Sequence, residues 1–320
     1  MGRIDVDSKM HADRIKNINL SVDFKKFKMK NPIMTASGTY GYTDEFNVFL
    51  DVKNIGAIVT KGVTLEVRPG NEGRRIFETE GGMINRIGLE NVGIEAFIAE
   101  KLPRLKEKGI NFVLNIAGKT VEDYVKLAEI CDNKGIQAIE TNVSCPNVKS
   151  GCLEFGTDKN CLYDLISGIR EKYNGFLIVK LTPNVANIEE LAHAAQNAGA
   201  DCISAINTLK GLGVELGFNG NKVLKTLVQG GLSGKCVKPV ALSMVKRIKE
   251  AVTIPIIGLG GISNLNDMLE FVAVGADAVQ IGTENFTTPD IAEKLVFELA
   301  EFIEKQGFRD FNDLKEELRR

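Results

Sequence analysis

Histidine is scarce in this sequence, since only His11 and His193 occur among 320 residues. His11 lies in a polar N-terminal stretch, and His193 lies in IEELAHAAQNAGAD, a segment with the spacing of a helix. The sequence therefore has almost no residues for a catalytic triad that uses histidine as a base, or for a metal site rich in histidine. Proton transfer must use a cysteine, a lysine, a tyrosine or a carboxylate instead.

A basic surface and a membrane-spanning run are also missing. Lys and Arg total 40 against 42 Asp and Glu, a net charge of −2, and no basic block stands out. Nucleic acid is therefore not expected as a partner. The charged N-terminal stretch does not resemble a signal peptide, and no apolar run approaches the ~18 residues of a membrane span. We expect a soluble, cytoplasmic protein that does not contact a membrane.

The six cysteines form no CxxC pair and have no regular spacing. This pattern favours reduced thiols over a disulfide framework or a zinc site, and no bound metal is expected. Hydrophobic residues make up 44% of the chain, which is enough for one large core or two modest ones. An intrinsically disordered chain is therefore excluded.

Short apolar runs rich in β-forming residues recur along the chain, each followed by a stretch that reads as helix or loop. The runs cover residues 32–37, 57–62, 112–118, 138–144, 177–182, 202–208, 254–261 and 278–283. Near-continuous apolar strands are typical of a parallel sheet covered on both faces. Eight β/α units in roughly 250 residues predict an α/β protein with a TIM (β/α)8 barrel. A doubly wound open sheet is the alternative, but no GxGxxG follows the first strand, and the nearest pattern, GLGVELG, lies at 211–217.

Some connections are too long for a plain barrel, and all of them follow the C-terminal end of a predicted strand. They cover residues 63–110, 145–160 and 209–238. Barrel enzymes build their sites at this end, so we expect long loops that cover a site. The expected organisation is a leader over 1–17, a catalytic barrel over 18–306 and a C-terminal surface helix over 307–320.

Polar residues and glycines end nearly every predicted strand. They are Ser37, Lys61, Asn115, Asn142, Lys180, Asn207 with Thr208, Gly260 with Gly261, and Gly282 with Thr283. In a closed barrel they converge on one mouth, where glycine turns after strands seven and eight commonly hold a phosphate. A buried lysine needs a negative partner, which a reduced flavin would supply to Lys180. A pyridoxal phosphate enzyme would also use a lysine and a phosphate cup, but it explains the asparagines poorly.

Cys145 is the best candidate for a base. It follows the fourth predicted strand in a polar loop with Pro146, where the two strand-end lysines could favour its thiolate. Most cysteines are small buried hydrophobic residues, and Cys131, Cys161 and Cys202 fit that interpretation. Cys152 lies seven residues after Cys145, and a reactive disulfide between these two stays open.

Several segments together resemble class 1 dihydroorotate dehydrogenase over about residues 18–306. They read NPIMTASGTYG, TKGVTLEVRPGN, NRIGLEN, TNVSCPNVK, LTPNV, INTLKG, GGLSG, IPIIGLGGI and AVQIGTENF. Within class 1, NVKSGCLEFGTD and GGLSGKCVKPVALSMV are more similar to the 1B subtype, whose catalytic chain works beside an electron-transferring subunit.

The resemblance implies specific site residues. FMN is expected to contact Ser37, Thr60, Lys61, Asn115, Asn142, Lys180, Ile206, Gly234, Gly260, Gly261, Gly282 and Thr283. Dihydroorotate or orotate is expected to contact Lys61, Asn85, Gly88, Leu89, Asn142, Asn147, Asn207 and Thr208. Cys145, at a catalytic centre shared with Lys61, is expected to remove a proton from C5 of dihydroorotate while the C6 hydride passes to flavin N5.

The resemblance also implies partners and a pathway, the synthesis of UMP. Electrons are expected to reach NAD through a separate subunit carrying FAD and a [2Fe–2S] cluster, with a homodimer of this chain at the core of a heterotetramer. A fumarate-linked class 1A enzyme is one alternative. A dihydropyrimidine dehydrogenase-like enzyme is another, although Asn147 favours dihydroorotate. A barrel that binds a phosphorylated ligand without catalysis is the non-enzyme alternative.

Overall fold

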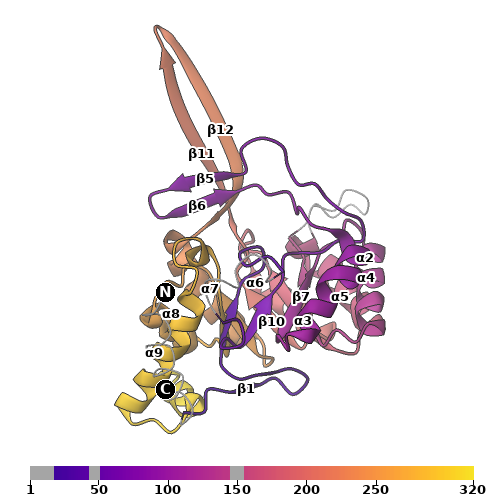
Figure 1. Ribbon diagram of the computed structural model, residues 1–320, viewed down its shortest axis with the longest axis vertical. Coiled ribbons are helices and arrows are strands. Elements are labelled where there is room, and N and C mark those ends of the chain that lie inside the picture. The colour runs from indigo at the N-terminus through magenta and orange to yellow at the C-terminus, as the bar shows by residue number, and fades with distance from the viewer. Residues whose placement is uncertain (1–17, 43–50, 145–154) are drawn as a thin grey trace.

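The computed structural model describes residues 18–42, 51–144 and 155–320, and a closed barrel of parallel strands forms its centre (Figure 1). Around the barrel the order is β10-β13-β14-β3-β4-β7-β8-β9. In chain order the strands are β3 (Ile33–Thr35), β4 (Ala57–Val59), β7 (Phe112–Ile116), β8 (Ala138–Asn142), β9 (Phe176–Leu181), β10 (Cys202–Ala205), β13 (Ile256–Leu259) and β14 (Ala278–Ile281). Each overlaps one of the predicted apolar runs, so the predicted (β/α)8 barrel is confirmed.

Helices surround the barrel in the figure and cover the outer face of its strands. They are α2 (Gly93–Ala96), α3 (Leu102–Glu107), α4 (Val121–Asn133), α5 (Lys159–Lys172), α6 (Ile188–Asn197), α7 (Lys238–Ala251), α8 (Leu265–Ala273), α9 (Ile291–Gln306) and α10 (Phe311–Leu318). Local sequence sets their ends. The Thr120 hydroxyl accepts from Asp123 N at the start of α4, and Gly307 ends α9 in the left-handed conformation. No helix in the described ranges is long and apolar enough to cross a membrane.

The N-terminal end of the barrel is closed by aromatic side chains. A short hairpin of β1 (Val22–Asp23) and β2 (Lys28–Met29) brings Phe24 and Phe27 onto Phe176, the first residue of β9. The ring centroids of Phe24 and Phe27 lie 5.4 and 5.6 Å from that of Phe176, in nearly parallel stacks. All three rings are buried, so the hairpin seals the barrel at the end opposite the expected site.

Two of the long connections carry strands that the sequence pattern did not predict. Strands β5 (Ile76–Thr79), β6 (Gly82–Asn85), β11 (Leu209–Asn219) and β12 (Lys222–Ser233) form an antiparallel sheet in the order β11-β12-β6-β5. The segment 211–217, which most resembled a dinucleotide fingerprint, lies inside β11. The hairpin of β11 and β12 extends well beyond the barrel (Figure 1).

The segment 307–320 folds back on the barrel domain through helix α10. Phe311 and Leu314 are buried, and Phe311 N donates to Asn19 O at 3.0 Å. The Arg319 guanidinium donates to the carbonyl oxygen of Ala276 at 2.7 Å, just after α8. One face of this terminal helix therefore contributes to the core.

The aromatic stack at the base of the barrel gives a stability prediction. Phe176→Ala should lower the free energy of unfolding by about 3–5 kcal/mol, because it leaves a cavity between Phe24 and Phe27. Tyr163→Ala, at a position that is 43% exposed on α5, should change it by no more than about 0.5 kcal/mol. Urea unfolding of both variants measures the difference, and equal losses would contradict this role of the stack.

Candidate active site

The parallel register of the barrel brings polar side chains from successive strands to one level. Asn115 on β7 pairs with Glu140 on β8, and Asn142 on β8 pairs with Lys180 on β9. Lys180 in turn pairs with Ser204 on β10. Because side chains alternate along a strand and paired residues point to the same face, these side chains share the inside of the barrel near its C-terminal end.

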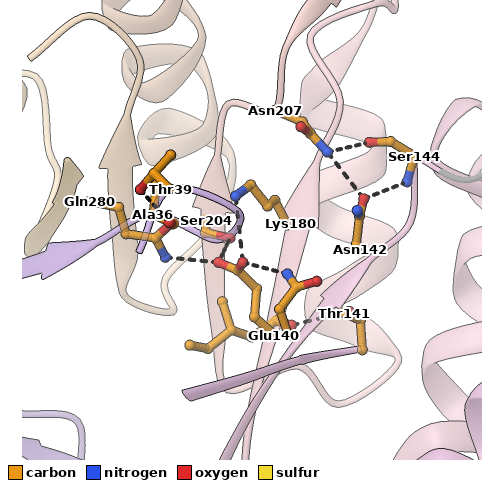
Figure 2. A network of polar contacts seen from close by, with 12 residues as sticks. Ala36, Thr39, Glu140, Thr141, Asn142, Ser144, Lys180, Ser204, Asn207 and Gln280 are labelled. Carbon is orange, nitrogen blue, oxygen red and sulfur yellow. Dashed lines mark hydrogen bonds and ion pairs between the residues drawn. The ribbon is translucent and has the colours of Figure 1, made fainter. Parts of the chain in front are cut away.

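The two predicted asparagines Asn142 and Asn207 lie in direct contact (Figure 2). Asn207 Nδ2 donates to Asn142 Oδ1 at 3.1 Å and to Ser144 Oγ at 2.9 Å. The backbone N–H of Thr208 donates to Asn207 Oδ1 at 2.9 Å, which fixes the orientation of that amide. The ends of β8 and β10 thus form one connected polar surface, as the sequence predicted.

Lys180 has a carboxylate partner inside the protein, which the sequence analysis missed. Its ammonium lies 3.5 Å from Glu140 Oε1, and the two side chains are 7% and 0% exposed. The expectation that the negative partner would come from a flavin was therefore incomplete. The signal was present in the run AIETN, where an acid occupies a buried position of a barrel strand.

Lys61 lies just after β4 and is partly exposed, in contrast to Lys180. Its ammonium is 3.7 Å from Glu90 Oε1, and Arg75 forms an ion pair with the same carboxylate. A side chain at Gly62 would approach Leu89, so the predicted substrate residues around Leu89 lie next to this cation. Lys61 is accordingly the more accessible of the two predicted cations.

Asn85 and Thr208, both predicted to contact substrate, meet through the backbone of β12. Asn85 Nδ2 donates to Gly231 O at 3.1 Å. A Cβ at Gly231 would collide with the Thr208 hydroxyl, so only glycine allows this approach. Gly88 and Leu89 have positive φ angles of 79° and 55°, which turn the chain between Asn85 and Glu90, the ion-pair partner of Lys61.

The glycine turn after β13 lies against Gly234, which directly follows β12. Gly234, Gly260 and Gly261 have φ angles of 109°, 128° and 84°. A Cβ at Gly261 would lie 2.9 Å from Gly234 O and 2.8 Å from Lys238 Cβ, at the first turn of α7. Bare backbone and the start of a helix are a suitable setting for a phosphate.

The remaining predicted cofactor residues lie around these turns. Thr283 Oγ1 donates to Ser233 Oγ at 2.8 Å, which joins the end of β14 to β12. Ile206 approaches Gly260, and Ala36, which precedes Ser37, approaches Gly282. On the other side, Asn115 N donates to the buried Thr60 hydroxyl at 3.3 Å. The structure therefore gathers the predicted cofactor residues that it describes around one end of the barrel.

Cys145, Asn147 and Cys152 lie outside the described residues, whereas Ser144 belongs to the asparagine cluster. Cys131 and Cys202 are buried and free, as expected. Cys161 is half-buried and disulfide-bonded, which corrects the expectation of six reduced thiols and of a fully buried Cys161.

Burial makes several other acid–base candidates unsuitable as a base. It raises the pKa of the Cys131 thiol to about 12 and that of Cys202 well above its usual value. Burial also raises the pKa of the Tyr40 and Tyr173 hydroxyls. These groups stay protonated near neutral pH, so the structure offers none of them as a rival to Cys145.

The residues present fit a planar ligand that carries hydrogen-bond donors and a phosphate. Asn115 Oδ1 and Gln280 Oε1 are buried acceptors without a hydrogen-bond partner in the described part of the chain. An unsatisfied buried acceptor is costly, and a bound N–H group would satisfy it. With the lysine and the glycine turns, the site has the features of a flavin-dependent (β/α)8-barrel oxidoreductase.

Comparison with known proteins identifies the family. Residues 19–303 match the family model described as dihydroorotate dehydrogenase. A protein of Geotalea uraniireducens is 47% identical over 297 residues, which cover 92% of this chain and 97% of that protein. A protein of Geobacter metallireducens is 45% identical over 301 residues, covering 94% and 98%. Both are named dihydroorotate dehydrogenase B (NAD(+)), catalytic subunit.

The chain therefore belongs to the dihydroorotate dehydrogenase family, as its motifs predicted, and it is an oxidoreductase of that family. The names of the relatives agree with the predicted 1B subtype, and membership of this family implies a flavin cofactor.

The close approach at Gly261 gives a prediction that separates steric from conformational effects. Gly307→Ala, at a φ of 78° with open space around it, should cost only the strain of the left-handed backbone, about 1–2 kcal/mol of unfolding free energy. Gly261→Ala should cost more and should weaken flavin binding at least about tenfold, because it also displaces Gly234 or Lys238. Urea unfolding and flavin titration measure both effects. Identical behaviour of the two variants would contradict the close packing of the turns.

Proposed function

We propose that this chain is the catalytic subunit of an NAD-linked dihydroorotate dehydrogenase. It oxidises (S)-dihydroorotate to orotate in the synthesis of UMP, and its electrons pass to NAD through a partner subunit. The observation that carries the proposal is the convergence of Lys180, Lys61, the asparagines and the glycine turns at one end of the barrel, in a chain 47% identical to a relative with that name.

FMN is the flavin that these residues would hold. Gly234, Gly260, Gly261 and the pair Gly282–Thr283 would present backbone N–H groups to its phosphate. Lys180 would place a positive charge beside the electron-rich edge of the ring, and Asn115 Oδ1 would accept from a ring N–H group. When bound, FMN supplies the acceptor for the hydride that leaves C6 of the substrate.

Dihydroorotate is a small ring with one carboxylate and an imide-like edge, so it needs a cation and several amides. Lys61 would supply the cation at the partly exposed side of the site. The amides of Asn142 and Asn207, together with Asn85, can both donate and accept hydrogen bonds. Asn147 would add a fourth amide from outside the described residues.

Cys145 would act as the base that removes the C5 proton. The low number of histidines and the raised pKa values of Cys131, Cys202, Tyr40 and Tyr173 support this assignment. Its neighbour Ser144 belongs to the polar cluster at the end of β8. A positioned base of this kind typically contributes 10²–10⁴-fold to a rate.

Replacing Cys145 tests its role. Cys145→Ala should slow reduction of the bound flavin by dihydroorotate by about 10²–10⁴-fold, while flavin and orotate still bind, because the base acts only during the reaction. Cys145→Ser should keep a trace of activity that rises with pH, since a hydroxyl is a much weaker acid than a thiol. The matched control is Cys236→Ser, at an exposed free cysteine, which should reduce flavin at the normal rate. Anaerobic stopped-flow absorbance measures the rates, and an unchanged rate in Cys145→Ala would assign the base elsewhere.

A separate electron-transfer subunit is the proposed partner, carrying FAD and a [2Fe–2S] cluster. The words "catalytic subunit" in the names of the relatives support such a partner. We further propose a homodimer of this chain at the core of a heterotetramer, in a cytoplasmic complex.

The β11–β12 hairpin supports an association surface on this chain. In the observed pairing, one face of the hairpin carries exposed apolar side chains, namely Leu212, Val214, Leu216, Phe218, Val223 and Leu227. The other face meets Phe77 at Gly213, and Glu215 forms an ion pair with Arg74. An apolar face of this size is typical of a surface that binds another subunit.

The electron acceptor is tested with the purified chain, dihydroorotate and either NAD or fumarate, before and after addition of the candidate partner subunit. We expect orotate formation with NAD only when the partner is present, because the site of this chain is filled by flavin and substrate. Rapid NAD reduction by the chain alone would refute the need for a partner. Rapid fumarate reduction would place the chain in class 1A, and a protein that binds no flavin would support a non-catalytic barrel.

A further inference from the structure

A buried carboxylate inside the barrel, that of Glu140 on β8, contacts side chains from four other strands (Figure 2). Glu140 Oε1 accepts from Asn115 Nδ2 at 2.8 Å and lies 3.5 Å from Lys180 Nζ. Glu140 Oε2 accepts from Ser204 Oγ and from Gln280 Nε2, both at 2.8 Å. Oε1 therefore has one hydrogen bond and one ion pair, Oε2 has two hydrogen bonds, and the Glu140 side chain is completely buried.

This arrangement fixes the direction of two amide groups. A carboxylate can only accept hydrogen bonds, so Asn115 and Gln280 must turn their NH₂ groups toward Glu140. Their carbonyl oxygens are then left as acceptors, and neither has a partner in the described part of the chain. Because of Glu140, the side-chain amides of Asn115 and Gln280 both present an acceptor, not a donor, to a ligand that binds beside them.

The same carboxylate places a negative charge beside Lys180. Barrel interiors are usually filled by branched apolar side chains, and a buried ion pair often adds little stability compared with apolar residues of similar volume. Stability alone is therefore a poor reason for a charged layer here. Lys180 and Asn115 are both proposed flavin contacts, so the layer lies directly behind that site.

We propose that Glu140 is a positioning residue for the flavin: it orients Asn115 and Lys180 and offsets part of the positive charge that Lys180 presents to the ring. The inference rests on the proposed function, because it needs a flavin at the strand ends. It assigns a role to a residue that contacts neither substrate nor the reacting atoms.

The sign of the effect follows from the charges. The reduced ring is the more electron-rich form, so the positive Lys180 favours reduction and the negative Glu140 opposes it. Removing the charge of Glu140 should therefore make the bound flavin easier to reduce. Removing the charge of Lys180 should make it harder to reduce. Two groups that served only to hold the fold would not shift the potential in opposite directions.

The test measures the midpoint potential of the bound flavin in the full-length holoprotein by equilibration with a reference dye. The variants are Glu140→Gln, Lys180→Met and the double variant. A unit charge roughly 10 Å away at an effective dielectric constant of about 20 changes an equilibrium by about tenfold. For a two-electron couple this is about 30 mV, upward for Glu140→Gln and downward for Lys180→Met. The double variant should lie above Lys180→Met.

Asp201→Asn is the matched control. Asp201 also pairs with a cation, Arg170, at 2.8 Å, but it precedes β10 at the opposite end of the barrel. This variant should lose stability without a change in potential. Glu140→Asp, which keeps the charge, should return the potential toward the normal value.

Each outcome decides the proposal. A potential for Glu140→Gln that equals that of Asp201→Asn would overturn it, as would a downward shift. If Glu140→Gln does not fold, Lys180→Met is compared with the double variant, in which neither charge is left without its partner. Equal potentials of those two variants would also overturn the inference. Wild-type protein that binds no flavin would contradict the proposed function itself. Normal flavin binding together with unshifted potentials in the variants would contradict only the role of Glu140.

Discussion

The register of the parallel strands is the constraint on which the rest of the structure depends. Because β7, β8, β9 and β10 are aligned residue by residue, Asn115, Glu140, Lys180 and Ser204 fall at neighbouring levels and face the same interior. A shift of one residue in any of these strands would turn its polar side chain outward, among the helices. The same strand register therefore closes the barrel and aligns the side chains of the site, and the aromatic stack packs the opposite end of the barrel.

The two sides of the site differ in their physical chemistry: one holds buried charge, and the other is formed by bare backbone. Around Glu140, charge is buried and both carboxylate oxygens accept hydrogen bonds, which orients the side chains on this side of the site. Around Gly234 and Gly261, side chains are absent, and the backbone comes close enough to present its own N–H groups. A ligand with a polar ring at one end and a phosphate at the other matches this division.

The barrel could be predicted from the sequence because its strands are buried on both faces and read as separate apolar runs. The convergence of the strand-end residues could then be predicted as well, since the C-terminal ends of the parallel strands lie at the same end of the barrel. The β11–β12 hairpin was not predicted, because the glycines of GLGVELG conceal the alternation of its exposed apolar face. Glu140 was missed for a related reason: one acid inside AIETN does not disturb the strand pattern, and its partners come from residues far away in the chain. The roles of Cys145 and Asn147 stay predictions, because both lie outside the described residues.

A crystal structure of the chain with FMN and orotate tests the central claim most directly, namely that the strand ends form one site for flavin and substrate. The account predicts the phosphate against the turns at Gly261 and Gly282, and the Lys180 ammonium within hydrogen-bonding distance of the flavin ring while still paired with Glu140. Orotate should contact Lys61 and Asn207. A flavin bound elsewhere, or a ring with Lys180 turned away from it, would contradict the account.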